Sequence, residues 1–197
     1  MKKKYWAFLI GSWCLSVGMQ AAKVDTLSVH SDAMNKEVQV ITICPDKAMA
    51  GEKCPVLYLL HGYGGNAGTW LGIKPELPQI ADKEGIIFVC PDGKNSWYWD
   101  SPLNKEYRYE TFVSKELVNY IDKNFTTKVE RGGRAITGLS MGGHGSLWLS
   151  IRHKDVFGGG GSMSGGLDIR PFPNNWEMKK QLGEEASNKQ RLSLIHI

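Results

Sequence analysis

A serine between two glycines is the residue of this sequence best suited to nucleophilic chemistry. Ser140 stands in the run GLSMG (138–142), between residues 134–137, which predict a short buried strand, and residues 141–151, which predict a helix. This pattern is typical of a nucleophile elbow, a tight turn that pushes the serine hydroxyl out of the end of a sheet. Gly138 and Gly142 suit that turn, because side chains there would collide with the neighbouring strand and helix. The run predicts covalent catalysis by Ser140.

A second glycine-rich run, HGYGG (61–65), follows the apolar residues 55–60, which predict a buried strand. In an enzyme with a nucleophile elbow, one hydrogen-bond donor to the oxyanion is the backbone N–H of the residue after the nucleophile, here Met141. The other donor comes from such a glycine-rich loop. We expect the second donor to be the N–H of Tyr63, each donor contributing about 3–4 kcal/mol. Gly62 and Gly64 would let the backbone approach the substrate, and His61 would brace the loop. Either run alone could be an ordinary turn, but two at strand ends, in this order, favour a hydrolase.

Predicted strands and helices alternate along the chain. Strands are expected at 24–30, 38–44, 55–60, 86–90, 134–137 and 157–164, helices at 75–83, 109–125 and 141–151, and a loop at 45–53. This alternation predicts one α/β domain, over residues 23–191, with a mostly parallel sheet flanked by helices. The residues from 24 to 30 should form an edge strand.

The first 22 residues have the pattern of a secretory signal peptide. Three lysines precede a short apolar run, and small residues offer a cleavage site after Ala21 or Ala22. A membrane anchor is the alternative, but an apolar run of roughly 13 residues is short against the about 20 that span a bilayer. We expect a secreted or periplasmic protein without stable membrane insertion. Net charge is +4, and the three leader lysines account for most of it, so no nucleic-acid partner is indicated.

Export would place the remaining cysteines in an oxidising compartment. Cys44 and Cys54 flank a loop and could form a disulfide, whereas Cys90 ends an apolar run and should be a buried small residue. The sequence has no C-x-x-C run and no cluster of cysteine with histidine. We therefore expect no structural zinc, and nothing implies another metal or an organic cofactor.

Four stretches together resemble a known family: PVLYLLHGYGG, NSWYWDSP, YETFVSKELVNYID and ITGLSMGGHGS. The chain is similar to esterase D-like α/β-hydrolases, which include S-formylglutathione hydrolases, feruloyl and acetyl-xylan esterases and mycolyltransferases. The resemblance covers about residues 38–166. It implies an α/β-hydrolase fold, an acyl-enzyme on Ser140, and oxyanion N–H groups from Tyr63 and Met141. In this family the catalytic acid and histidine come late, after the last strands, and the chain is expected to lack the C-terminal strands and helix.

The triad acid and histidine are therefore expected outside this chain. His144 should point into the fold, His153 should be solvated, and Asp92 and Asp100 should fix loops. Asp168 follows a strand end but comes one strand early for the family's acid. His196 belongs to LSLIHI (192–197), which resembles a translated sequencing-adapter end, so we expect a reading frame truncated near Arg191 and an inactive fragment.

An aromatic loop suggests the substrate. Trp97, Tyr98 and Trp99 could stack on a phenolic acid or a sugar, or could pack against the sheet instead. With export, this loop favours hydrolysis of feruloyl or acetyl esters of plant polysaccharide. Two alternatives stay open: acyl transfer to a carbohydrate acceptor, and a non-catalytic module. Oligomeric state and the exact ester are not predicted.

Overall fold

The computed structural model describes residues 22–172 and 174–184. The leader up to residue 21, His196 and the tail at 192–197 lie outside the described residues, so predictions about them stay predictions. Within the described ranges, no helix is long and apolar enough to cross a membrane.

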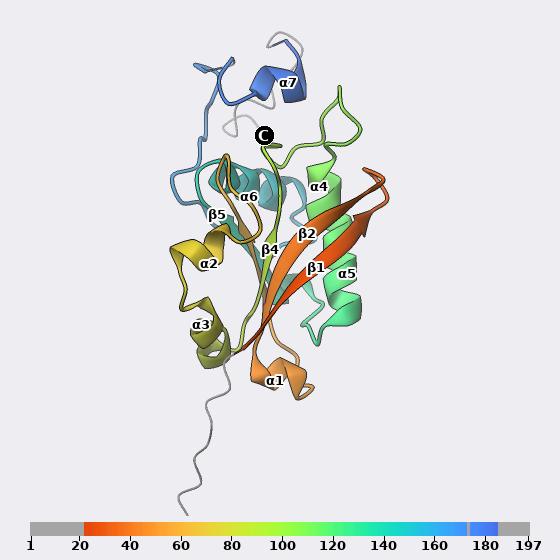
Figure 1. Cartoon of the computed structure of the whole chain (residues 1–197), viewed down its shortest axis with the longest axis vertical. Coiled ribbons are helices and arrows are strands. Elements are labelled where there is room, and N and C mark those ends of the chain that lie inside the picture. Colours follow the sequence, from red (N-terminus) through yellow and green to blue (C-terminus); the bar gives the residue numbers. More distant parts are fainter. Residues whose placement is uncertain (1–21, 173, 185–197) are drawn as a thin grey trace, which may run out of the picture.

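In the described part of the chain, the centre of the fold is one sheet of six strands in the order β1-β2-β4-β3-β5-β6. The strands are β1 (Lys23–Ser31), β2 (Lys36–Cys44), β3 (Val56–Leu60), β4 (Ile87–Pro91), β5 (Arg134–Gly138) and β6 (Gly159–Gly160). The β1–β2 hairpin is antiparallel and joins β4 antiparallel, while β4, β3, β5 and β6 run parallel. The predicted edge strand and the mostly parallel sheet are confirmed (Figure 1).

Within residues 22–172 and 174–184, seven α-helical segments connect or flank these strands. They are α1 (Asp46–Met49), α2 (Thr69–Ile73), α3 (Leu77–Glu84), α4 (Tyr109–Thr111), α5 (Leu117–Asn124), α6 (Met141–Arg152) and α7 (Met178–Leu182). A π-helical stretch, Phe112–Glu116, joins α4 to α5, and a 3₁₀ turn spans Arg131–Gly133. The helix predicted at 109–125 is therefore continuous but contains a π-helical stretch. Helices α1 and α2 were not predicted, because both are too short to show helical periodicity.

The strand predicted at 157–164 is wrong in length. Only Gly159 and Gly160 pair with β5 as a strand, although the N–H groups of Gly161 and Met163 still donate to carbonyl groups of β5. A run of glycines has no side chains to pack on a sheet and loses more entropy on ordering than other residues, so the regular ladder is short.

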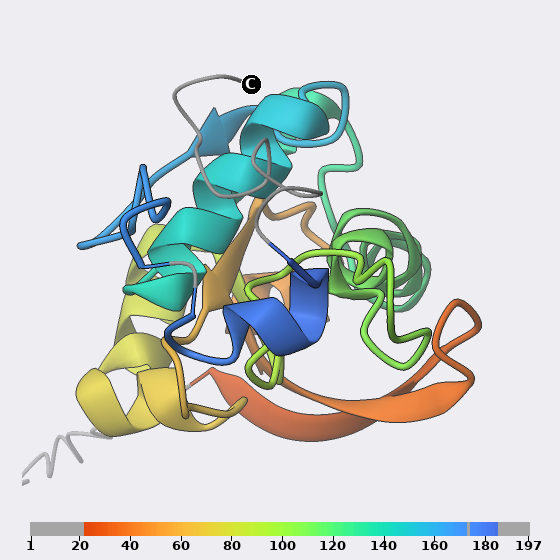
Figure 2. The ribbon, with the colours of Figure 1, turned by 90° about the horizontal axis from the view of Figure 1, so that it is seen from above.

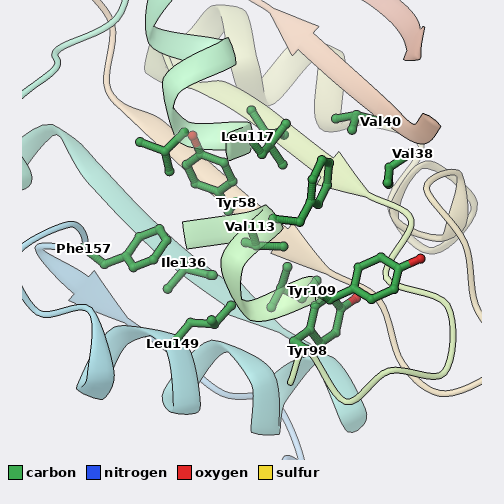
Figure 3. Close-up of a cluster of buried hydrophobic side chains, with 14 of the residues drawn as sticks. Val38, Val40, Tyr58, Tyr98, Tyr109, Val113, Leu117, Ile136, Leu149 and Phe157 are labelled. Carbon is green, nitrogen blue, oxygen red and sulfur yellow. The ribbon is translucent and has the colours of Figure 1, made fainter. Parts of the chain in front are cut away.

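The sheet separates two apolar layers, because alternate side chains of its strands point to opposite faces. On one face, Val56, Tyr58 and Leu60 of β3 pack beneath the helices α4–α5 and α6. On the other, Leu57 and Leu59 pack against α2 and α3. Figure 2 shows α2–α3 on one side of the sheet and α5 and α6 on the other. The first layer is the larger, and Figure 3 shows its interior, where the rings of Tyr58 and Phe157 meet edge to face with centroids 5.8 Å apart.

The parallel register brings three loops to one edge of the sheet. Leu60 of β3 lies opposite Gly138 of β5, and β4 pairs on the other side of β3. The residues that follow these three strands, 61–65, 92–101 and 139–141, therefore start from neighbouring strand ends. This carboxyl edge is where open α/β sheets place their ligand sites.

The cysteine pairing considered from the sequence is not present in the structure. Cys44 and Cys54 are both buried free thiols, and burial raises the pKa of each. Cys90, in β4, is buried among apolar residues, as predicted.

Candidate active site

Ser140 occupies the turn between β5 and α6 in a conformation that non-glycine residues rarely adopt. Its φ is 55° and its ψ is −115°, outside the common allowed regions. The turn is held because Ser140 N–H donates to the Met163 carbonyl and Gly142 N–H donates to the Leu139 carbonyl, each at 2.8 Å. Such strain, fixed by surrounding bonds, is typical of a functional position.

The two elbow glycines are required by close backbone contacts. A Cβ added at Gly138 would lie 2.3 Å from the carbonyl oxygen of Gly142, and one added at Gly142 would lie 2.2 Å from that of Leu60. Neither backbone neighbour can yield to such a contact. These contacts are the collisions with strand and helix that the sequence predicts for side chains at positions 138 and 142.

The glycine-rich loop lies directly beside the elbow. A Cβ at Gly62 would be 3.5 Å from the Cβ of Ser140 and 3.3 Å from the carbonyl oxygen of Leu139. Gly64 has a φ of 75°, which favours glycine even though the space around it is open. In the described part of the chain, the backbone N–H groups of Tyr63 and Met141 donate to no protein acceptor. Two unused donors thus flank the serine.

His61 connects the glycine-rich loop to the loop after β4. Its Nδ1 donates to the carbonyl of Gly62 at 2.7 Å, and its Nε2 accepts the N–H of Gly93 at 2.9 Å. The ring is buried, with Asp92 Oδ1 3.6 Å from Nε2. These contacts fix the loop conformation, as expected, and occupy both ring nitrogens.

The loop after β4 is itself fixed by two carboxylates. Asp92 accepts the Lys94 side chain at 2.6 Å and the Lys94 N–H at 3.0 Å. Burial acts to raise the pKa of Asp92, but nearby His61 and the Lys94 hydrogen bonds hold it well below its ordinary value. Asp100 accepts the hydroxyl and N–H of Thr111. Both aspartates fix loops, as predicted.

A pocket of about 250 Å³ opens beside Ser140. Four aromatic rings line it, those of Tyr63, Trp97, Phe172 and Trp176, and Asp168 lies at the same pocket. The rings of Phe172 and Trp176 meet with centroids 5.7 Å apart, and both side chains remain partly exposed. Sequence reasoning missed Phe172 and Trp176, because they lie in an irregular segment after the last strand and carry no periodic signal.

The expectation that the whole aromatic loop faces a substrate is wrong for two of its three residues. Tyr98 and Trp99 are fully buried, and the hydroxyl of Tyr98 donates to the His61 carbonyl at 3.2 Å. Trp97 is largely buried but lines the pocket. The packing alternative therefore holds for Tyr98 and Trp99, which support the site from beneath.

His144 lies inside the fold, as predicted. Its Nδ1 donates to the Gly166 carbonyl at 2.7 Å, while Nε2 is buried without a hydrogen-bond partner among the described residues. The ring is surrounded by the indoles of Trp97, Trp99 and Trp148. Burial lowers the pKa of His144 to about 4, against the effect of the Gly166 hydrogen bond.

His153 is only partly exposed, whereas the sequence predicts a solvated side chain. Its Nε2 donates to Oε1 of Glu110 at 3.0 Å, and its side chain is half-buried. A histidine in a charged stretch was expected to face water, but the buried carboxylate of Glu110, distant in sequence, gives it a partner. Asp168 is paired with Arg170. In residues 22–172 and 174–184, no histidine side chain forms a hydrogen bond with Ser140, although the backbone N–H of His144 donates to the Ser140 carbonyl at 2.9 Å.

The arrangement agrees with comparisons to known proteins. The Esterase family model matches residues 31–195. The chain belongs to this esterase family. An acetyl esterase of Caldicellulosiruptor saccharolyticus is 29% identical over 151 residues, which cover 73% of this chain and 56% of the relative.

The chain is also similar to an acyltransferase and to a solved esterase structure. A diacylglycerol acyltransferase/mycolyltransferase of Mycobacterium leprae is 34% identical, over 74% of this chain and 44% of the relative. The solved structure of a ferulic acid esterase matches with a TM-score of 0.73 and 29% identity, over 90% of this chain and 71% of that one. The chain thus spans about half the length of these two curated relatives, 56% of the acetyl esterase and 44% of the mycolyltransferase.

Proposed function

We propose that the complete protein is an exported serine carboxylic-ester hydrolase that acts through an acyl-enzyme on Ser140. One observation carries this proposal: a strained serine at a strand-to-helix turn lies against a glycine-rich loop, beside two N–H groups that have no acceptor among the described residues. Membership of the esterase family supports the reaction class.

In the proposed first step, the Ser140 oxygen attacks the ester carbonyl carbon and its proton passes to a histidine base. The carbonyl oxygen becomes an oxyanion, which accepts hydrogen bonds from the N–H groups of Tyr63 and Met141. Collapse breaks the bond to the alcohol, which leaves with the proton. Water then attacks the acyl-enzyme through the same steps and releases the acid.

The pocket supports an aromatic acyl group as substrate. Trp97, Phe172 and Trp176 offer ring surfaces next to Ser140, and planar rings stack well on a phenolic acid. A ferulic acid esterase and an acetyl esterase are among the relatives. We propose feruloyl or acetyl esters of plant polysaccharide as substrates. The test compares the rates at which the protein hydrolyses methyl ferulate and methyl acetate. If Trp176→Ala lowers the preference for methyl ferulate, the aromatic assignment is supported. An unchanged preference would contradict it.

The nucleophile is tested by Ser140→Ala in the complete protein. We expect loss of ester hydrolysis by on the order of a million-fold in kcat. Ser28→Ala, an exposed serine on β1, is the matched control and should hydrolyse like the unmodified protein. Hydrolysis that survives Ser140→Ala would exclude the mechanism.

We propose that the 197-residue chain alone hydrolyses esters poorly. The basis is that no histidine side chain in the described residues forms a hydrogen bond with Ser140, while the rings of His61, His144 and His153 bond to other partners. Turnover by the 197-residue chain that equals that of a longer reading frame would contradict this.

Acyl transfer to a carbohydrate hydroxyl is the second candidate, favoured by the identity to the mycolyltransferase. The acyl-enzyme would be the same, and only the acceptor would differ. Product analysis with and without a sugar acceptor separates the two: an acylated sugar indicates transfer, and free acid alone indicates hydrolysis.

Export is proposed from the leader pattern in residues 1–22. Fractionation of producing cells should find the protein outside the cytoplasm with an N-terminus at or near residue 23. An unprocessed cytoplasmic protein would contradict this.

A further inference from the structure

A short segment after the last strand lies over the loops that surround Ser140. Helix α7 and the residues before it lie above the carboxyl edge of the sheet (Figure 2). Met178 and Leu182 are buried in the larger apolar layer, and Trp97 Nε1 donates to the Trp176 carbonyl at 3.2 Å. The segment is therefore packed onto the loop after β4.

Glu177 of this segment reaches back to the glycine-rich loop. Its Oε2 accepts the Tyr63 hydroxyl at 3.2 Å and the Asn95 side-chain N–H at 3.2 Å. Its other oxygen, Oε1, pairs with Lys180 at 3.2 Å. One carboxylate oxygen thus joins two loops that are more than thirty positions apart in the sequence.

Asn95 extends this connection to the backbone beside the nucleophile. Its Oδ1 accepts the N–H of Gly64 at 2.8 Å. Because Asn95 donates to Glu177 through Nδ2, the carboxylate fixes which face of the amide turns toward Gly64. Gly64 directly follows Tyr63, so this chain of bonds restrains the backbone next to the Tyr63 N–H.

The same carboxylate holds the Tyr63 side chain. The phenol would otherwise be free to turn, since it is partly exposed at the pocket. Two bonds, one through the Tyr63 hydroxyl and one through Asn95 to Gly64, therefore converge on Glu177. The backbone at this point is strained, because Trp176 and Glu177 both have positive φ values, 48° and 57°. The neighbouring contacts must maintain this conformation.

We propose that Glu177 is a positioning residue that aligns the Tyr63 N–H for the oxyanion, acting through Asn95 and the Tyr63 hydroxyl. This rests on the proposed function, in which Tyr63 donates to the oxyanion. Glu177 does not touch the reacting atoms. Its contribution is to hold one donor in place before the substrate arrives, which stabilises the transition state more than the bound ester.

The direct test is amide hydrogen exchange of Gly64, measured by NMR. In Glu177→Leu, Gly64 should exchange at least about fivefold faster, because Asn95 loses the bond that orients it. Glu177→Gln keeps an acceptor oxygen and should restore the unmodified rate. Lys180→Ala is the matched control, since it removes only the partner of the other oxygen, and β3 amides give the internal reference for folding. Equal Gly64 exchange in Glu177→Leu and the unmodified protein would overturn the proposal.

Kinetics of p-nitrophenyl acetate hydrolysis by the complete protein give the second readout. Glu177→Leu should lower kcat about tenfold and change KM by no more than about twofold, and Glu177→Gln should restore kcat. In the double variant, Asn95→Ala should lower kcat little beyond Glu177→Leu alone, because both residues belong to one chain of hydrogen bonds. A loss in KM alone would contradict a transition-state role. The exchange measurement needs no turnover. If hydrolysis proved independent of Ser140, the proposed function would be wrong, but Gly64 exchange would still show whether Glu177 holds Asn95 and Gly64 in place.

Discussion

The backbone of Gly142 in α6 packs directly against the carbonyl oxygen of Leu60 at the end of β3. A Cβ at position 142 would lie 2.2 Å from that oxygen. This contact fixes the distance between the elbow and the glycine-rich loop, because residue 61 follows Leu60 and Ser140 precedes α6 by one residue. The spacing of nucleophile and oxyanion loop is thus set by a backbone contact rather than by side chains.

Gly142→Ala should destabilise the protein strongly. The methyl group must displace β3 or α6, and overpacking of this kind costs about 1–3 kcal/mol or more. Gly72→Ala in α2 is the matched control, because nothing lies within 4 Å of its Cβ position. That variant should be as stable as the unmodified protein or slightly more so. Urea unfolding of both variants measures the difference in stability. Equal unfolding midpoints would show that the close contact at Gly142 does not determine stability.

Replacing the nucleophile by glycine should stabilise the fold while removing activity. Ser140 has a φ of 55°, a value that glycine adopts without strain. We expect Ser140→Gly to unfold at a higher urea concentration than Ser140→Ala, by about 1 kcal/mol. If the alanine variant is the more stable, the turn is not strained in the native protein.

The buried Glu110 carboxylate should make stability depend on acid pH. It accepts Trp148 Nε1 and Arg152 Nε at 2.8 Å and His153 Nε2 at 3.0 Å. Burial acts to raise the pKa of Glu110, but these bonds lower it from 4.5 to about 2. A depressed carboxylate pKa stabilises the folded state above about pH 4.5, and that stabilisation is lost as pH falls toward 2.

Glu110→Gln should therefore cost about 1–2 kcal/mol at pH 7, because it removes the charge that strengthens these three hydrogen bonds, while Arg152 remains partly exposed to water. Its stability should change less than that of the unmodified protein between pH 5 and about pH 2. Glu130→Gln, at an exposed position, is the control and should leave both quantities unchanged. Unfolding curves at the two pH values check this, and parallel pH profiles for Glu110→Gln and the unmodified protein would contradict it.

His144 should contribute a second pH dependence, in a higher range. Its pKa is lowered from 6.5 to about 4, so the unfolded chain binds a proton in this range that the folded chain excludes. Stability should fall by about 3 kcal/mol as pH drops from 6.5 toward 4. His144→Phe removes the titrating group and should flatten this part of the profile, whereas His30→Phe, at an exposed site, should not. Identical profiles for His144→Phe and the unmodified protein would contradict this assignment.

Much of the fold and part of the site could be predicted from the sequence. Continuous apolar runs such as residues 56–60 carry a strong strand signal, and the glycine runs around Ser140 and Tyr63 mark backbone contacts that only glycine permits. These features are local in sequence, so they can be read without coordinates.

The rest depends on contacts between distant residues. Glu110 gives His153 a buried partner from 43 positions away, and Glu177 meets Tyr63 across 114 positions. Neither pairing leaves a periodic pattern in the sequence. Trp97 and Trp99 look alike in the sequence, yet one lines the pocket and the other packs beneath it, because the turn at 97–98 takes positive φ values.

Mass spectrometry of the complete protein after brief reaction with p-nitrophenyl acetate tests directly whether Ser140 forms the acyl-enzyme. We expect an acetyl group on Ser140, formed in a burst with one equivalent of p-nitrophenol, and no acetylation of that peptide in Ser140→Ala. An intact protein that hydrolyses the ester while the Ser140 peptide stays unmodified and Ser140→Ala stays active would contradict the central claim.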